Sequence, residues 1–252
     1  MRLKKNLQPR CFVPTAAAII IGNEILTGKF TDENGPWLAQ ECRRLGIDLE
    51  RIVIIPDVIG IIADEVSRMC DEVDYVFTTG GIGPTHDDVT MAAIAAAFQV
   101  PLVRSESLEA LIRAKMGGGA NEAGLAMADV PEGTELWNSD DLKYPVTVFR
   151  NVIIFPGVPA FFKAKFLAIC DRFSGSAVDS RSFRTEEKET SIAKILLHAQ
   201  EKWPTVDIGS YPQFDTKPAS VVVTLDGRNA EALGQCESWL RTQIQSSDGN
   251  AS

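Results

Sequence analysis

One stretch decides the fold: Thr78-Thr79-Gly80-Gly81-Ile82-Gly83-Pro84-Thr85-His86-Asp87-Asp88-Val89-Thr90. Its first two residues end a predicted strand at residues 73–79. It precedes four apolar residues at helical spacing, Met91, Ile94, Ala95 and Phe98. A glycine-rich loop between a strand and a helix lies at the carboxyl end of a parallel sheet, where open α/β folds bind ligands. The stretch therefore predicts an α/β fold with a ligand site at this loop.

The loop has the composition of a phosphate site. Its glycines allow the backbone to approach a phosphate closely, and the helix that follows offers free N–H groups to an anion. Asp87 and Asp88 cannot hold an anion themselves, so they indicate a divalent cation that bridges carboxylate and phosphate. The alternative is structural, because Thr85-x-x-Asp88 also fits a capping box.

Two standard phosphate motifs are excluded. The loop ends at His86 where the dinucleotide fingerprint needs a third glycine, so a Rossmann dehydrogenase is not indicated. Residues 22–30 resemble a Walker loop with one residue too many, and Phe30 stands where Ser or Thr must hold magnesium. His86 itself is expected to be a solvated loop side chain rather than a general base.

A second loop carries further polar residues. Residues 22–24 directly follow the apolar strand at residues 16–21, and the strand at 52–55 is followed by Asp57, which either joins the rim or forms an Asx turn. Parallel strands place such loops at one edge of the sheet. One crevice is therefore expected to collect Glu24, Asp32, Asn34, Asp87 and Asp88.

Charge and composition narrow the function classes. The net charge is −9, and residues 11–180 hold 13 basic and 24 acidic side chains. This excess argues against a nucleic-acid groove and suits divalent cations. Two histidines cannot build a three-His zinc site. Five widely spaced cysteines indicate reduced thiols, and no apolar run is long enough to span a membrane, so a cytoplasmic protein is expected.

The chain is expected to have five segments. The first large block alternates strands and helices, a Ser- and Gly-rich stretch follows it, and the remainder has the pattern of a small α+β unit. The predicted segments are a basic N-terminal extension (1–14), the α/β domain (15–172), a linker (173–182), the small α+β domain (183–245) and a disordered tail (246–252).

These motifs carry a family resemblance. Residues 22–28, 32–34 and 80–90 resemble the molybdopterin-binding MoaB/MogA-type family, and the Gly-Pro-Thr-x-Asp-Asp form is most similar to its CinA branch (competence/damage-inducible protein A). The similarity covers roughly residues 15–172. Residues 150–159 and 208–212 resemble the N-terminal half of eukaryotic FAD synthases. The resemblance implies a three-layer, parallel-sheet MoaB/Mog-like domain followed by the small domain.

The resemblance also implies roles by position. Asp88 and Asp87 would be the catalytic and metal-binding carboxylates, with Glu24 as a third catalytic residue. The expected substrate-binding residues are Gly22, Asn23, Asp32, Asn34, Thr78, Thr79, Gly80, Gly81, Gly83, Pro84, Thr85, Thr90 and Gly157. The sequence departs from the family at residues 138–145, so the resemblance does not predict which residues form one wall of the pocket. It also departs at Val158, which weakens a molybdopterin assignment.

Two chemistries are implied. Relatives of the CinA and FAD-synthase type hydrolyse ADP-ribose or FAD to AMP with a divalent metal (Mg²⁺, Mn²⁺ or Co²⁺), which is the expected activity. The alternatives are molybdopterin binding or adenylylation in molybdenum cofactor biosynthesis, and a non-catalytic nucleotide-binding module. The expected partners are a small nucleotide or pterin ligand and copies of the chain in a homo-oligomer, with no nucleic acid and no membrane.

Overall fold

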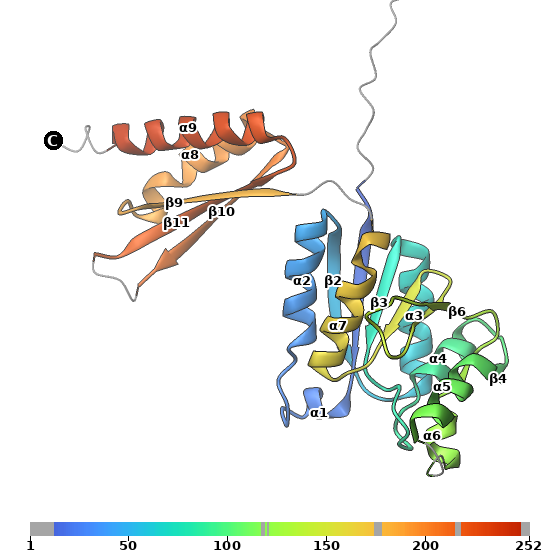
Figure 1. Ribbon diagram of the computed structural model, residues 1–252. Helices are drawn as coiled ribbons and strands as arrows, with labels where there is room; N and C mark the ends of the chain where they lie inside the picture. Colours follow the sequence, from blue (N-terminus) through green and yellow to red (C-terminus); the bar gives the residue numbers. More distant parts are fainter. Residues whose placement is uncertain (1–12, 117–118, 120, 174–177, 215–217, 248–252) are drawn as a thin grey trace, which may run out of the picture. The chain divides into compact units, whose positions relative to one another are not determined.

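The computed structural model describes residues 13–116, 119, 121–173, 178–214 and 218–247 (Figure 1). The chain divides into two compact units, residues 1–175 and 176–252. Each unit has its own hydrophobic core. Within the described residues, no helix combines the length and the hydropathy that a membrane crossing requires.

The first unit is built on a six-stranded sheet. Its strand order is β2(Asp48–Ile55), β1(Thr15–Ile21), β3(Tyr75–Thr79), β8(Val152–Phe155), β7(Val146–Phe149) and β6(Glu135–Trp137). The first four strands pair in parallel, whereas β8 with β7 and β7 with β6 pair antiparallel. The prediction of a parallel sheet is confirmed for these four strands, and β1, β3 and β8 are mostly apolar because both of their faces are covered. The sheet is mixed at its β6 end.

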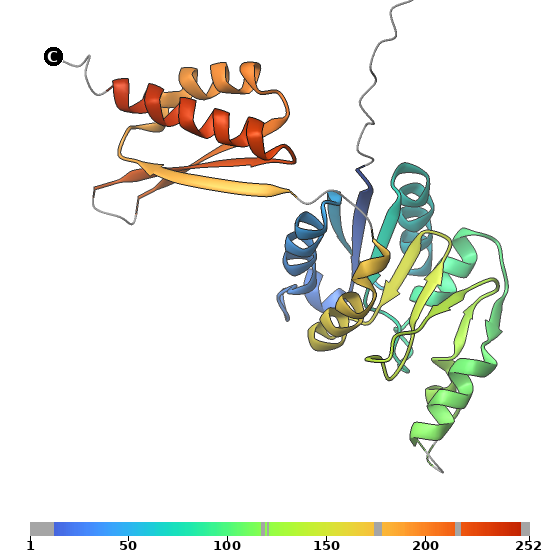
Figure 2. The same cartoon turned by 45° about the horizontal axis from the view of Figure 1, so that its top comes forward.

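Helices cover both faces of this sheet, so the unit has three layers (Figures 1 and 2). One face carries α2(Asn34–Leu45), α7(Pro159–Ile169) and the short 3-10 helix η2(Cys170–Arg172), and the other carries α3(Ile59–Glu72) and α4(Thr90–Ala97). Successive residues of β1 point to opposite faces. Ala18 therefore joins the cluster of Leu38 on α2, and Ile19 joins the cluster of Ile62 on α3. Burying one such Leu or Ile side chain stabilises the fold by about 1.5–3 kcal/mol.

Residues 102–131 form a small substructure that we call the arm. It consists of β4(Leu102–Arg104), α5(Glu106–Met116), α6(Glu122–Ala126) and β5(Asp129–Pro131). β4 and β5 pair antiparallel, and a separate apolar cluster joins α5 to α6. Arg104 reinforces the arm through ion pairs with Asp129, with Glu122 at 3.1 Å and with Glu109 at 3.6 Å.

The second unit is a three-stranded antiparallel sheet with helices on one face. Its elements are β9(Asp179–Thr185), α8(Glu189–Lys202), β10(Val206–Gln213), β11(Ser220–Gly227) and α9(Ala230–Ser247), with strand order β10-β11-β9. Figure 2 shows the orange and red helices on the same side of these strands. Val223 of β11, Ile192 of α8 and Leu240 of α9 are fully buried in the core between them.

The structure corrects two segment boundaries. The predicted linker (173–182) overlaps both units, because Phe173 is buried in the first core and β9 begins at Asp179. Sequence periodicity misses β9 because Phe183 is its only buried residue. The predicted disordered tail (246–252) starts too early, since α9 continues to Ser247. Residues 1–12, most of the predicted N-terminal extension (1–14), lie outside the described residues, as do residues 248–252.

Candidate functional site

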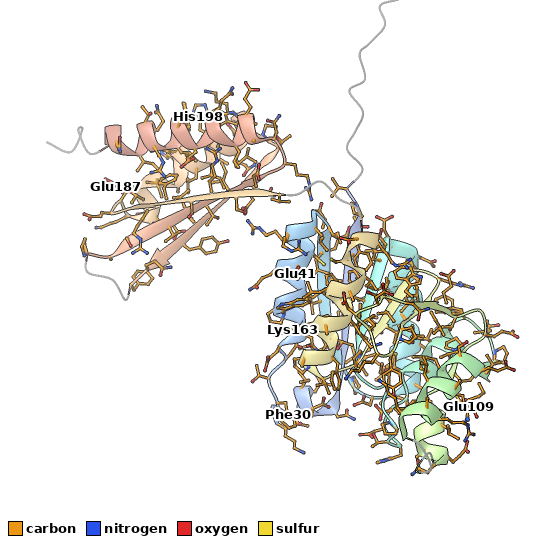
Figure 3. All side chains as sticks on the ribbon, in the orientation of Figure 1. Phe30, Glu41, Glu109, Lys163, Glu187 and His198 are labelled. Carbon is orange, nitrogen blue, oxygen red and sulfur yellow. The ribbon has the colours of Figure 1, made fainter. Side chains whose placement is uncertain are left out.

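A large pocket opens at the carboxyl edge of the parallel strands. Its volume is about 1240 Å³, and the loops after β1, β2, β3 and β8 line it. The short helix α1(Asn23–Leu26) lies in the first of these loops (Figure 1). Phe30, exposed at 60%, lies at the end of the same loop (Figure 3). The sequence prediction that these loops meet at one edge is confirmed for β1 and β3.

Two glycines bring the backbones of neighbouring loops into contact. Gly80 has φ +104°, and a Cβ atom there would lie 2.0 Å from the carbonyl oxygen of Ile21. A Cβ atom on Gly157 would lie 3.3 Å from the Cα atom of Gly80. No other residue type fits at Gly80 without moving main chain. The floor of the pocket is therefore bare backbone.

Three successive backbone N–H groups of this loop are available to a ligand. The N–H groups of Gly81, Ile82 and Gly83 donate to no other atom in the part of the chain that the structure describes. All three residues line the pocket. Free N–H groups on a glycine-rich loop are the feature by which protein backbones bind phosphate.

Buried threonine and asparagine side chains fix the loops. The Thr90 hydroxyl donates to the carbonyl of Gly80 at 2.9 Å. Asn34, exposed at 4%, donates through Nδ2 to Thr79 Oγ1 at 2.9 Å and to the carbonyl of Gly157 at 2.8 Å. Its Oδ1 atom is buried and has no partner among the described residues. Asn34 thus joins α2 to the ends of β3 and β8.

Asp88 closes the turn at the end of the glycine loop. Its Oδ2 atom accepts from the Thr85 N–H at 2.8 Å and from the Thr85 hydroxyl at 2.5 Å. A Cβ atom on Gly83 would lie 2.7 Å from the same oxygen. The pattern is the one a capping box uses, but α4 begins at Thr90, so these bonds stabilise the loop rather than the helix. Asp88 is still half-exposed and lines the pocket.

Asp87 is the more solvated of the two neighbouring carboxylates. Its side chain is 59% exposed, and its polar contacts with the neighbouring Thr85 side chain and with a backbone N–H lower its pKa below the usual value. His86 is 99% exposed and is not part of the pocket lining, which agrees with the prediction that it is a solvated side chain. Asp87 therefore presents a charged carboxylate to the pocket at neutral pH.

Three other carboxylates lie on the same side of the site, each beside a backbone group. The Glu24 carboxylate folds over Gly22, where a Cβ atom would lie 2.6 Å from Oε1. Asp32 accepts from the N–H groups of Asn34 and Gly35 at 3.0 Å, at the start of α2. Asp57 Oδ2 accepts from the Asn23 N–H at 2.8 Å and lines the pocket, so of the two alternatives predicted for Asp57 the place at the rim is the one observed, since this bond joins two loops and is not a local Asx turn. We call Glu24, Asp32, Asp57, Gly80, Gly81, Gly83, Asp87 and Asp88 the acidic wall.

The carboxylates of this wall fit a cation site that the ligand completes, in contrast to a site made by protein side chains alone. No group of three or more His, Cys, Asp or Glu side chains converges on one point in the described ranges. A cage made by protein ligands alone is thus not present. Mg²⁺ and similar ions are commonly held by one or two carboxylates together with substrate phosphates. Asp87 and Asp88, next to three free N–H groups, fit a cation that binds with its phosphate ligand.

The structure brings most of the predicted site residues together. Eleven line the pocket: Glu24, Asp32, Asn34, Thr79, Gly80, Gly81, Gly83, Pro84, Asp87, Asp88 and Gly157. Five are not among the lining residues: Gly22, Asn23, Thr78, Thr85 and Thr90. Thr78 and Thr90 are fully buried. Hydrogen bonds of Asn23, Thr85 and Thr90 hold the loops in place, whereas the buried Thr78 hydroxyl has no partner among the described residues.

A second part of the pocket was not predicted. It comes from the arm, from the loop before β7 and from α7, and we call its residues Leu108, Ile112, Lys115, Met127, Tyr144 and Lys165 the basic wall. Lys165 lies on α7 at the border of the face that buries Phe162, Phe166 and Ile169, and it is itself half-buried.

The comparisons with known proteins agree with this architecture. Residues 17–174 match the family described as "Probable molybdopterin binding domain". The chain belongs to this family. Residues 177–249 of this molybdopterin-binding-domain protein match the family described as "FAD synthase, middle domain". The predicted MoaB/Mog-like domain and its resemblance to FAD synthases are thereby confirmed.

Individual relatives add the CinA branch. A protein of Archaeoglobus fulgidus is 37% identical over 215 residues, which are 85% of this chain and 91% of that protein. A "Probable FAD synthase" of Caenorhabditis elegans is 30% identical over 90% of this chain, which spans only 49% of that relative's length. A "CinA-like protein" of Myxococcus xanthus is 35% identical over 57% of this chain and 36% of its own length.

A solved structure from another organism is similar to this chain. The crystal structure of the protein CinA from Thermoplasma acidophilum, whose function is given as unknown, aligns with a TM-score of 0.59 and 27% identity. The match covers 64% of this chain and 98% of that one. The chain is thus a CinA-like protein with a molybdopterin-binding fold and a further small domain.

Proposed function

We propose that the protein hydrolyses an adenosine pyrophosphate such as ADP-ribose or FAD. Water adds across the P–O–P bond, and the products are AMP and the second monophosphate, ribose 5-phosphate or FMN. The observation that carries the proposal is the row of free N–H groups at Gly81, Ile82 and Gly83 beside the carboxylates of Asp87 and Asp88. Backbone N–H groups that can bind an anion, next to carboxylates that can bind a cation, favour a phosphate ligand that binds together with a divalent cation.

The residues of the acidic wall have distinct roles in this proposal. The N–H groups of the glycine loop hold a phosphate and stabilise the charge that grows on its oxygens as water attacks. Asp87 and Asp88 hold a divalent cation, which when bound neutralises the pyrophosphate and polarises water. Glu24 accepts the proton that the attacking water loses. Asn34 acts as a positioning residue, because it fixes Gly157 and Thr79 at the pocket edge.

The test is release of AMP by the purified protein. ADP-ribose and FAD are each incubated with Mg²⁺, Mn²⁺ or Co²⁺, and AMP is measured by chromatography. Asp88→Asn should lower the rate by about 100-fold or more, as expected for loss of a charge that stabilises the transition state. An Asn side chain still accepts from the Thr85 N–H, so the turn is retained.

Two controls make this result interpretable. Asp64→Asn removes an exposed carboxylate of α3 that lies outside the pocket, and it should leave the rate unchanged. Circular dichroism and thermal unfolding establish that both variants are folded. Folded wild-type protein that releases no AMP with any of these metals contradicts the proposal.

A second candidate is molybdopterin binding or adenylylation, which the family description favours. It predicts tight binding of molybdopterin and, with ATP, transfer of AMP to it without net hydrolysis of FAD or ADP-ribose. Binding measured by the intrinsic fluorescence of the pterin, alongside the AMP assay, separates the two activities. Binding of nucleotide with neither reaction would identify a non-catalytic module.

A further inference from the structure

The two walls of the pocket carry opposite charges. The acidic wall contributes five carboxylates, whereas Lys115 and Lys165 on the basic wall are cations. In the proposed hydrolysis, only residues of the acidic wall bind the ligand, and they bind the phosphate of its AMP half. The pocket extends beyond the acidic wall to the basic wall, which has no role in that reaction.

Lys165 is a half-buried cation that lacks a carboxylate partner among the described residues. Its Nζ atom donates to the carbonyl of Tyr144 at 3.0 Å and to the carbonyl of Pro145. Among the described residues, no carboxylate lies within ion-pair distance of it. Burial, with a smaller contribution from Lys115, lowers the pKa of Lys165 to about 8. Two carbonyls fill two of the three donor positions of an ammonium group, which leaves one for a ligand.

Lys115 approaches the same tyrosine from the arm. Its Nζ atom lies 3.8 Å from the centroid of the Tyr144 ring, within cation–π range. Tyr144 therefore meets Lys165 through its carbonyl and Lys115 through its ring. Neither lysine is neutralised by this contact, so two positive charges border one part of the pocket.

The surface beside these cations is apolar. Leu108 and Ile112 of α5 and Met127 of the arm line the pocket with Lys115 and Tyr144. Such a surface accepts a flat ring system, because apolar and aromatic side chains bury ring faces while a few polar groups fix orientation. Cations at the margin of an apolar surface fit a ring that carries an anion.

We propose that Lys165 and Lys115 form a subsite for a phosphate monoester attached to a fused heteroaromatic ring, the part of the pyrophosphate ligand that is not AMP. This inference rests on the proposed function, since it names the other half of the same ligand. FMN and a pterin phosphate share this chemistry, whereas ribose 5-phosphate lacks the ring. The subsite therefore favours FAD over ADP-ribose.

The test is equilibrium binding to the full chain by calorimetry, without metal and without turnover. The probes are FMN, riboflavin, ribose 5-phosphate, 6-hydroxymethylpterin monophosphate and AMP. FMN or the pterin phosphate should bind about tenfold tighter than riboflavin and ribose 5-phosphate, because only the first two offer both ring and charge. The tighter of the two identifies the ring.

Variants assign the effect to the basic wall. Lys115→Met and Lys165→Met should each weaken FMN binding about tenfold and leave AMP binding unchanged. Lys163→Met is the matched control, because Lys163 lies on the same helix outside the pocket, with Nζ 3.8 Å from Glu33 Oε2 (Figure 3). Where Lys165→Met unfolds, Lys115→Met decides the result, since Lys115 makes no main-chain contact of this kind.

The outcomes separate this inference from the proposed function. The subsite is overturned if neither FMN nor the pterin phosphate binds more tightly than riboflavin and ribose 5-phosphate. This conclusion holds even if the protein releases AMP. The same holds if both lysine variants keep wild-type affinity for FMN. Ring-phosphate discrimination without any AMP release supports the subsite and contradicts the hydrolysis.

Discussion

The acidic and basic walls of the pocket are built in different ways. The acidic wall combines five carboxylates with the backbone of the glycine loop, and that backbone is held by Asn34, Thr79 and Thr90 through buried hydrogen bonds at the ends of parallel strands. The basic wall consists of side chains from the arm, one loop and α7, and its contacts are an ammonium on carbonyls and a cation on a ring. A rigid wall suits the reacting phosphates, whose geometry is fixed, and a side-chain wall suits the group that differs between ligands.

The largest expected effect is on the acidic wall. Gly80→Ala should destabilise the protein by more than about 3 kcal/mol, because Cβ would meet the Ile21 carbonyl at 2.0 Å and φ is positive. The free energy of unfolding is measured in urea. Gly60→Ala on α3, with no atom within 4 Å of its Cβ position, should instead stabilise by about 0.5–1 kcal/mol. Equal effects of the two changes would contradict a rigid wall.

A smaller effect is expected in the arm. Arg104→Met removes the ion pairs to Asp129 and Glu122, which are partly exposed, so the loss should be about 1 kcal/mol. Hydrogen exchange should speed up in residues 102–131, and FMN binding should weaken while AMP binding does not. Arg113→Met removes only an exposed pair with Glu109 within α5, and it should change neither property. If AMP binding falls with FMN binding in Arg104→Met, the walls are not independent.

The smallest effect is a pH dependence confined to the basic wall. The Lys165 ammonium has a pKa of about 8, below the usual 10.5, so it is lost as pH rises through 8. FMN affinity should fall between pH 7 and pH 9. Over the same range, unfolding should become harder, because the unfolded chain then binds more protons than the native one.

Lys165→Met removes both trends if Lys165 is their source. The other charged or titratable groups on this side of the pocket are Lys115, Lys143, Asp141 and Tyr144. Lys163→Met should behave like the wild type. A wild-type affinity for FMN that is constant from pH 7 to pH 9 would contradict the assignment.

The central part of the fold follows from sequence patterns. The mostly apolar stretches at 146–149 and 152–155 coincide with β7 and β8, because strands buried on both faces are rich in apolar residues. The loop at 78–90 can also be recognised in the sequence, by its glycines. Gly80 has to be glycine because a Cβ atom there would lie 2.0 Å from the carbonyl oxygen of Ile21, so the glycine marks a close approach of two backbones.

Other features depend on packing between distant segments. The strands β4 and β5 have three residues each, too few for a period to show. Thr90 and Thr85 look like phosphate ligands in sequence, but their hydroxyl groups are used by Gly80 and Asp88. The basic wall combines Leu108, Ile112, Lys115, Met127, Tyr144 and Lys165, and no local pattern in the sequence connects them. The position of Lys165 on α7 does not reveal that its Nζ atom donates to the carbonyls of Tyr144 and Pro145.

The contact between Gly80 and Gly157 has a consequence for how this family can diversify. A Cβ atom on Gly80 would lie 2.0 Å from the Ile21 carbonyl oxygen, so Gly80 tolerates no side chain, and a Cβ atom on Gly157 would press on the Gly80 Cα atom at 3.3 Å. The width of the pocket at this point is set by main chain and cannot be tuned by point substitution. Changes of ligand preference must then accumulate in the arm and in α7, where side chains can be exchanged one at a time. Laboratory evolution toward new pyrophosphates would most profitably randomise those segments and leave the glycine loops untouched.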